Sequence, residues 1–415
     1  MLPLPSDKQA PKRWRDEWIR FTTILRRAFV SKLRNRTNLW TTVFEAPVLA
    51  ALIGFVLRYA ESSKYNFASA FHIPTYLFLA LIVVMFLGLT NSADDIIRDR
   101  TILERERNLT IPLPYYVVCK FLTLSLFALI QCVLFLLIGD AILEIRGMFL
   151  PFLWFMVTTS LAGVAGGLLI SSLVSDAKTA ANIVPLVLIP QIILGGALIK
   201  YEEMNRNLNF MHILNRMPHE RQASGDRAQS QEVEVPFVCQ FIPMRWSYEA
   251  MIVAQAKLNP FTRRQDILTE EIEQLAKKQN FTKSDGDRLE ELKEALALLS
   301  GVAGKNAADV TRKLHEIDRI INGAALDGSK LDNGEGQVTA EQLFQNRKVT
   351  DMLTDAQMKQ KDYTARTRNV FFGPEKSYFG QKFDIFLFNS FVINGFTLLF
   401  LLWLLASLLR QLRTK

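Results

Sequence analysis

The sequence predicts an all-α, polytopic membrane protein with six transmembrane helices, and three observations support this fold class. Hydrophobic residues make up 49% of the 415 residues, but they gather in long runs between residues 39 and 200 and again between 384 and 409. Residues 257 to 370 are instead charged and have the periodicity of soluble helices. Lys and Arg gather at the ends of the apolar runs, as the flanks of membrane helices require. The chain therefore combines a membrane part with a water-exposed part.

The membrane part contains six predicted spans. A hydrocarbon layer about 30 Å thick requires roughly 20 apolar residues per helix. Six segments meet this requirement: Leu39–Tyr59, Ile73–Ala93, Tyr116–Gly139, Phe149–Val174, Asn182–Lys200 and Asp384–Leu409. The residues ahead of the first span are basic and polar and have no apolar core of a signal peptide, so we expect the first span to direct insertion.

The distribution of Lys and Arg predicts the orientation of the spans. Ten basic residues precede Leu39, four lie between Asp94 and Tyr115, and three close the chain after Leu409. The positive-inside rule then places both termini in the cytoplasm and residues 202 to 383 on the far side of the membrane. We expect this membrane to be the plasma (inner) membrane.

This orientation divides the chain into five predicted parts. They are a cytoplasmic tail with an amphipathic helix (1–38), spans one to five with a cytoplasmic loop at 94–115 (39–201), an extracytoplasmic loop with a re-entrant helix (202–256), an extracytoplasmic helical insertion (257–383), and the last span with a cytoplasmic tail (384–415).

The amphipathic helix is predicted from apolar residues at helical spacing among Arg and Lys. These residues are Trp18, Phe21, Leu25, Ala28, Phe29 and Leu33. Such a helix lies on the inner leaflet, either as an anchor on anionic lipid or as a docking helix for a cytoplasmic partner.

The segment 237–256 is apolar enough to suggest a seventh span, but Arg245 and Glu249 lie in its middle. Ionisable groups at mid-bilayer cost several kcal/mol, and another crossing would move the basic C-terminus outside. A re-entrant or interfacial helix fits better. Cys239 in this segment is either a free, buried thiol, which we favour, or a bridge between two copies of the chain.

The insertion reads as a small helical domain that projects outward. Its apolar residues recur every three or four positions in three stripes: Leu268, Ile272 and Leu275; Leu289, Leu292, Leu296 and Leu299; Val310, Leu314, Ile317 and Ile321. Asn306 is a predicted helix cap, Gly323 a helix end, and Thr339 with Gln342 a capping box. The stretch Gly323–Gly336 reads as a flexible loop.

No catalytic, metal or cofactor site is predicted on this chain. The Gly304–Lys305 pair lacks the spacing of a phosphate-binding loop, and neither a hydrolase elbow nor a zinc-ligand pattern occurs. The net charge of +8 arises largely from residues that flank apolar segments, so nucleic-acid binding is not expected.

The most informative segment is the charged loop after the second span. It holds Asp99, Arg100, Glu104, Arg105 and Glu106, a dense mixed-charge helix. The pattern D-R-x-x-L-x-R-E from 99 to 106 resembles the E-R-x-x-F-x-R-E signature of the G subfamily of ABC transporters and their bacterial relatives, with Asp for Glu and Leu for Phe. The chain thus looks like the membrane-spanning (permease) domain of a type-2 ABC exporter.

This resemblance implies several properties of the chain. The five charged residues would form a polar relay between the second span, the N-terminal helix and a partner ATPase domain, separate or detached, which would bind ATP and Mg. A second copy would complete the pathway as a homodimer, with spans two and five lining a central cavity. Residues such as Phe78, Phe86, Leu186 and Ile192 would face it and suit a lipid-like or amphipathic substrate, with glycan export left open.

Two features leave room for other interpretations. The insertion is larger than the family pattern suggests, and the family often carries the ATPase on the same polypeptide ahead of the N-terminal helix. A membrane scaffold whose outer domain recruits envelope proteins is the second hypothesis. A membrane-bound enzyme ranks last, because polar residues such as Gln131, Asp140 and Asn182 are isolated in the sequence.

Overall fold

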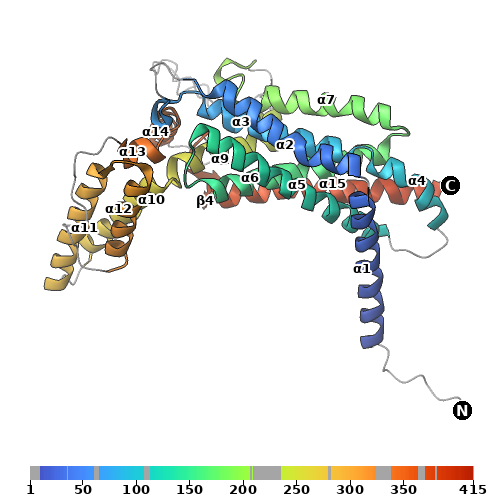
Figure 1. The fold of residues 1–415 in the computed structure, drawn as a ribbon, viewed down its shortest axis with the longest axis horizontal. Helices are drawn as coiled ribbons and strands as arrows, with labels where there is room; N and C mark the ends of the chain where they lie inside the picture. Colours follow the sequence, from blue (N-terminus) through green and yellow to red (C-terminus); the bar gives the residue numbers. More distant parts are fainter. Residues whose placement is uncertain are drawn as a thin grey trace, which may run out of the picture.

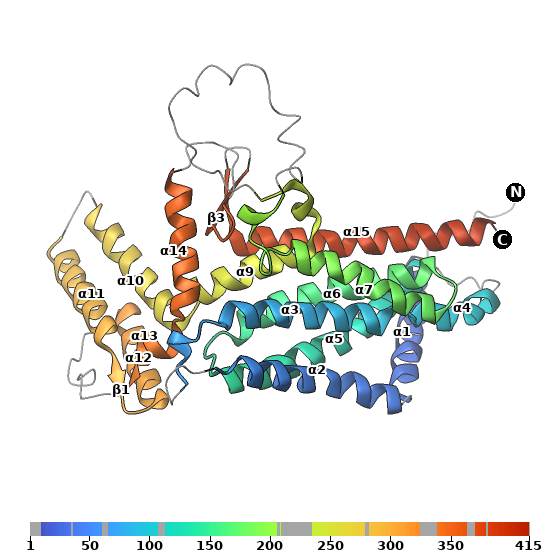
Figure 2. The same ribbon diagram turned by 90° about the horizontal axis from the view of Figure 1, so that it is seen from above.

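The fold is almost entirely helical. A computed structural model describes residues 10–34, 36–59, 65–106, 113–205, 208, 235–278, 282–323, 338–362, 370–378 and 381–414. A long helical bundle carries a separate group of shorter helices at one end (Figure 1). Helix α1 (Ala10–Arg34) and the C-terminal end of helix α15 (Ile385–Thr414) lie at the opposite end of the bundle (Figures 1 and 2).

Six of the described helices are long and apolar enough to cross a membrane. They are α2 (Arg36–Leu57), α3 (Ile73–Ser92), α5 (Leu113–Leu143), α6 (Phe149–Leu173), α7 (Ala177–Leu194) and α15 (Ile385–Thr414). The number of spans and their order along the chain agree with the sequence prediction. The chain is therefore a multi-pass membrane protein.

The fifth span differs from its predicted bounds of Asn182–Lys200, because α7 begins and ends five or six residues earlier. Asp176 caps its N-terminus by accepting a hydrogen bond of 2.8 Å from the backbone N–H of Thr179. A hydrogen bond from the Thr179 hydroxyl, together with this backbone bond, lowers the pKa of Asp176. Beyond the C-terminus, Gly196 has a φ of 82°, a left-handed conformation that ends the helix.

Helices α3 and α6 form the closest contact in the bundle through glycine. A Cβ atom at Gly88 would lie 2.6 Å from the carbonyl oxygen of Ser160, and one at Gly163 would lie 2.7 Å from the carbonyl oxygen of Met85. Small residues of this kind let membrane helices approach backbone to backbone. The tight α3–α6 pair fixes the position of α4, which follows α3 directly.

Helix α1 (Ala10–Arg34) runs across the bundle at the end where α4 (Asp95–Glu106) and the C-terminus lie (Figures 1 and 2). Part of the predicted apolar stripe packs against α5, because the ring of Phe29 lies 6.1 Å from Phe127 and that of Phe21 lies 6.1 Å from Tyr115. Trp18 remains 61% exposed. This stretch of the chain is helical, and its assignment as an amphipathic helix on the inner leaflet stays a prediction.

The segment with Arg245 and Glu249 forms a short 3-10 helix, η6 (Phe237–Phe241), and helix α9 (Pro243–Lys257). The 15 residues of α9 extend about 22 Å at 1.5 Å per residue, which is too short for a bilayer core of about 30 Å. Residues 243–256 are buried, and α9 packs against α3, α6 and α15. Its depth in the membrane stays a prediction.

The insertion has a hydrophobic core of its own. Its elements are α10 (Pro260–Ala276), α11 (Lys283–Gly301), β1 (Ala303–Gly304), α12 (Ala307–Ile321), β2 (Val338–Thr339) and α13 (Ala340–Phe344). The core contains members of all three predicted stripes, among them Leu268, Leu292 and Leu314. The Asn306 cap and the Thr339–Gln342 capping box are confirmed. Residues 324–336 of the predicted loop lie outside the described residues.

Two hydrogen bonds from Asn346, which follows α13, join the insertion to the segment ahead of α3. The side-chain amide of Asn346 donates to the carbonyl oxygens of Phe67 (2.7 Å) and Ala70 (2.8 Å) in the segment before α3. That segment includes the 3-10 helix η1 (Phe67–Ser69).

After α14 (Arg347–Asp362), the hairpin of β3 (Glu375–Tyr378) and β4 (Gln381–Asp384) leads directly into α15. A further 3-10 helix, η3 (Tyr201–Glu203), follows α7.

Candidate functional site

The site is built at the junction of α1, α4, α5 and α6. Helix α4 starts just after α3, and its first backbone N–H groups need partners outside the helix. The hydroxyl of Ser171, near the C-terminus of α6, accepts hydrogen bonds from the backbone N–H of Ile96 (3.0 Å) and Ile97 (3.2 Å). These bonds fix the start of α4 and direct Asp95 into the junction.

Asp95 is the centre of a buried ion cluster. Its side chain is 4% exposed, with Oδ1 2.6 Å from Nζ of Lys32 on α1 and Oδ2 2.9 Å from Nζ of Lys120 on α5. Nζ of Lys120 also lies 2.7 Å from Oδ2 of Asp99, and Asp99 accepts a hydrogen bond of 3.1 Å from the hydroxyl of Tyr116. These five residues, Lys32, Asp95, Asp99, Tyr116 and Lys120, are called the junction cluster below.

The junction cluster is balanced in charge, with two carboxylates and two ammonium groups. Buried ions are costly to desolvate, so each depends on its partner, and removal of one partner costs about 3–5 kcal/mol. Because Lys32, Asp95 and Lys120 come from three different helices, the cluster ties α1, α4 and α5 together.

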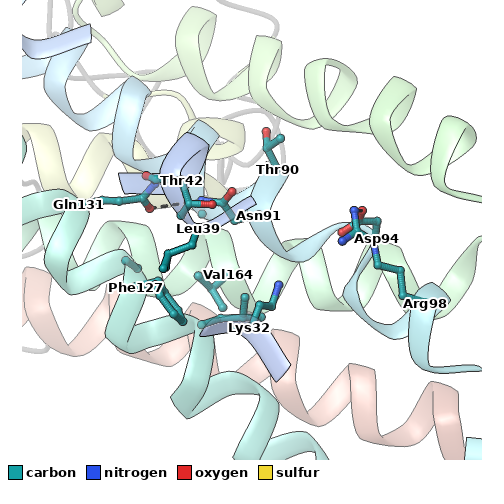
Figure 3. A pocket seen from close by; sticks show the side chains of 13 residues that line it. Lys32, Leu39, Thr42, Thr90, Asn91, Asp94, Arg98, Phe127, Gln131 and Val164 are labelled. Atoms are coloured by element: carbon teal, nitrogen blue, oxygen red, sulfur yellow. Dashed lines mark hydrogen bonds and ion pairs between the residues drawn. The ribbon is translucent and has the colours of Figure 1, made fainter. Parts of the chain in front are cut away.

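A cavity of about 190 Å³ lies beside the junction cluster. The polar end of its lining includes Lys32, which also belongs to the cluster, and Arg98, which pairs with Asp94. Gln131, 2% exposed, donates to the carbonyl oxygen of Thr42 (2.7 Å) and accepts from Asn91 (3.3 Å). Figure 3 shows these carboxamides meeting from α3 and α5, set apart from Asp94, which precedes α4, and from Arg98 on α4. Apolar walls complete the cavity: Leu39, Leu124, Phe127, Ala128 and Val164.

The structure brings part of the predicted relay to this junction. Asp99 belongs to the junction cluster, and Arg100 donates a hydrogen bond of 2.9 Å to the carbonyl oxygen of Val174, just beyond α6. Glu104, Arg105 and Glu106 lie on the C-terminal half of α4, and their side chains are outside the described residues.

Sequence reasoning missed four of the five cluster residues, all except Asp99. Lys120 is a single charge in an apolar run, which is itself a signal because intramembrane ions usually have partners. Lys32 continues the helical spacing of Phe21, Leu25 and Ala28 and so lies on the face of α1 that meets α5. Asp95 was included in the charged loop 94–115 without a role.

The residues predicted to line a substrate path lie apart from this cavity. Phe78 is buried, with its ring 5.1 Å from that of Tyr248, and Phe86 is partly buried against the core. Leu186 on α7 is 69% exposed and Ile192 is partly buried. Of the described residues that line the cavity, none belongs to α7, so a path between spans two and five stays a prediction.

A second buried ion cluster lies around α9. Nζ of Lys376 on β3 is 2.5 Å from Oε1 of Glu249, and Oε2 of Glu249 is 3.6 Å from Arg245. All three side chains are at most 1% exposed, and Asn389 on α15 donates to the backbone oxygen of Trp246 at 2.9 Å. Sequence analysis identified Arg245 and Glu249 as ionisable but could not find Lys376, about 130 residues away.

Cys239, on η6, is buried and free, as are Cys119 and Cys132. Burial raises the pKa of the Cys239 thiol to about 11. The favoured interpretation of a free, buried thiol agrees with this structure.

Comparison with known proteins supports the resemblance at the family level. Residues 19–219, just under half of the chain, match the family model described as ABC-2 type transporter. A search of curated proteins gave no match. The matched range contains α2 to α7, most of α1, and every residue of the junction cluster and the cavity. Permease domains of this family are not catalytic themselves and work with an ATPase component. Residues 19–219 are therefore the permease domain of a type-2 ABC transporter.

Proposed function

We propose that this chain is the permease of an ATP-driven exporter, and that a partner ATPase docks on α1 and α4. The partner would bind ATP and Mg and hydrolyse ATP, and the permease would move a lipid-like or amphipathic substrate out of the cytoplasm or the inner leaflet. Within the resemblance to the G subfamily, α1 corresponds to the family's connecting helix, the basic amphipathic helix that precedes the first span, and α4 to the charged helix of the polar relay.

The junction cluster is the observation that carries this proposal. Lys120 lies 2.9 Å from Asp95 and 2.7 Å from Asp99, so one ammonium serves two carboxylates on successive turns of α4. If α1 withdraws Lys32, Asp95 keeps a counter-ion in Lys120. The cluster can therefore exchange partners without leaving a buried carboxylate unpaired, which suits a junction with two alternative packings.

The distribution of charge supports the orientation. Helix α1 is rich in Arg and Lys, and α4 and the basic C-terminus lie at the same end of the bundle (Figure 1). The positive-inside rule assigns this end to the cytoplasm. The insertion at the other end would then be extracytoplasmic.

A second copy of the chain is part of the proposal. Large apolar side chains are exposed on α2 and α7, among them Phe55 (70%) and Leu186 (69%). Lipid contact accounts for some of this surface, and a homodimer with a pathway between the two copies would cover the rest. Export of an amphipathic molecule fits these apolar walls.

The proposal is tested by ATP hydrolysis of the permease with its partner ATPase in liposomes. Lys32→Gln and Asp95→Asn should each lower permease-dependent hydrolysis at least tenfold, because each removes about 1.4 kcal/mol or more of coupling. Asp94→Asn is the matched control, because Asp94 pairs with the exposed Arg98. The double variant Lys32→Asp, Asp95→Lys restores the opposite charges and should recover part of the activity. Unchanged hydrolysis in both single variants would remove the junction cluster from the mechanism.

A membrane scaffold is the second candidate, and the separate core of α10 to α13 favours it. The helices of that domain are capped and enclose their own core, as expected of an independent binding module. A scaffold needs no ATPase, so co-purification with one distinguishes the two functions.

A further inference from the structure

The cavity beside the junction cluster is too small for a complete amphipathic molecule. Its volume is about 190 Å³, whereas pockets for small organic ligands hold about 300–1,000 Å³. A water molecule occupies about 30 Å³, so the cavity has room for a handful of waters or for one compact head group. Any ligand with an acyl chain must leave that chain outside the cavity.

The lining indicates which head group would fit. Lys32 and Arg98 provide cationic donors, and the carboxamides of Asn91 and Gln131 provide neutral ones. Asp94 is the one carboxylate among the described lining residues, and it already pairs with Arg98. Charge-assisted donors of this kind favour a phosphate oxygen over a neutral head group.

The surroundings also favour an anion. On α1, Arg27 and Arg34 line an open hollow together with Val30 and Ser31, next to the turn that carries Lys32. Basic residues on a helix at a membrane surface attract anionic lipid by about 1 kcal/mol each. An anionic head group would therefore gather along α1 before it reached the cavity.

We propose that this cavity binds the phosphate head of an anionic amphiphile, with Lys32 and the Asn91–Gln131 pair as its ligands and the acyl chains left in the bilayer. The apolar walls formed by Leu39 and Phe127 would contact the glycerol or the first methylenes. Lys32 also forms an ion pair with Asp95 on α4. Its ammonium would therefore contact both the bound phosphate and the carboxylate of Asp95. This inference does not depend on transport, so it can fail while the proposed function stands.

The test measures lipid binding to the purified full chain in a neutral detergent by native mass spectrometry. Phosphatidylglycerol, phosphatidylcholine and soluble glycerol phosphate are titrated separately. We expect one saturable phosphatidylglycerol site per chain, with an affinity about tenfold above that for phosphatidylcholine, because the choline cation next to the phosphate of phosphatidylcholine would be repelled by Lys32 and Arg98. Glycerol phosphate that binds as tightly as the lipid would assign the same phosphate site to a cytosolic source.

Two pairs of variants separate specific binding from general attraction. Lys32→Gln should weaken phosphatidylglycerol binding about tenfold or more, whereas Arg20→Gln, an equal loss of charge at an exposed position of α1, should weaken it by no more than about fivefold, the effect of about 1 kcal/mol of general attraction. Ala128→Leu fills the cavity from α5 and should abolish the site, whereas Leu126→Phe adds bulk on the exposed face of the same helix and should not.

A cooperative thermal transition shows that each variant is folded, and for Lys32→Gln this transition is expected at a lower temperature because buried Asp95 loses one partner. If Ala128→Leu binds phosphatidylglycerol as well as the wild type does, or if phosphatidylcholine binds equally well, the proposal is wrong.

Discussion

The ammonium of Lys32 lies 2.6 Å from Oδ1 of Asp95, and this pair joins α1 to the first residue of α4. Asp95 is also paired with Lys120. Its removal leaves the buried ammonium groups of Lys32 and Lys120 with Asp99 as the one remaining carboxylate of the junction cluster. We expect Asp95→Ala to lower the free energy of unfolding in SDS by about 3 kcal/mol.

The control for this variant is Asp94→Ala, because Asp94 and its partner Arg98 are 24% and 55% exposed. An exposed pair contributes about 0–1 kcal/mol. Equal effects of the two substitutions would show that the burial of Asp95 has no energetic role.

The glycine contact between α3 and α6 predicts a strong position effect along one helix. Gly163→Ala places a Cβ 2.7 Å from the carbonyl oxygen of Met85, whereas the nearest atom to a Cβ at Gly166 is a Leu89 methyl at 3.4 Å. Gly163→Ala should lower the free energy of unfolding by about 2 kcal/mol, because the helices must move apart. Gly166→Ala should change it by less than about 0.5 kcal/mol. The same SDS titration measures both, and a neutral Gly163→Ala would contradict the close α3–α6 packing.

The buried pair of Lys376 and Glu249 predicts a dependence on pH. Burial lowers the pKa of Lys376 from 10.5, Glu249 offsets part of this lowering, and the charge of Arg245 adds to it. Between the lowered pKa and 10.5, the unfolded chain holds a proton that the folded chain has released. The contribution of Lys376 to the free energy of unfolding therefore rises with pH through this range.

The Lys376→Met variant should lack this rise. Thermal unfolding of the two proteins, followed from neutral pH to pH 10.5, should give a stability difference that grows in favour of the wild type. Parallel curves would mean that Lys376 has the same pKa in the folded and unfolded chain.

Membrane topology is tested by labelling with a membrane-impermeant maleimide. The native cysteines should react little, because Cys119, Cys132 and Cys239 are buried. In intact cells, Glu294→Cys on the exposed face of α11 should react, and Arg20→Cys on α1 should react only after the membrane is permeabilised. The reverse pattern would invert the proposed orientation.

The sequence was sufficient for the parts of the fold that depend on local pattern. Run length identified the six spans, and three- or four-residue steps identified α10, α11 and α12, because these signals come from each segment's own contact with lipid or core. The bounds of the fifth span were wrong at both ends. There the Asp176 cap and the left-handed Gly196 override the limits of the apolar run.

The candidate site could be predicted only in part. Asp99 and Arg100 stood out in a dense run of charge. The roles of Lys32 and Lys120 depend instead on ion pairs with Asp95, which is far from both in the sequence. The same holds for Lys376, which meets Glu249 only after the insertion has folded back on α9. Tertiary packing decides which residues pair across such separations in the sequence, and the local pattern of a single sequence does not specify that packing.

The central claim is that this permease works with an ATPase, and co-purification tests it most directly. The protein is extracted gently from its native membranes and captured by its C-terminal tail, and the accompanying chains are identified and quantified. We expect an ATP-hydrolysing chain or domain at equal stoichiometry, and its yield should fall for the Asp95→Asn variant. Capture of envelope proteins with no ATPase would contradict the exporter and favour the scaffold.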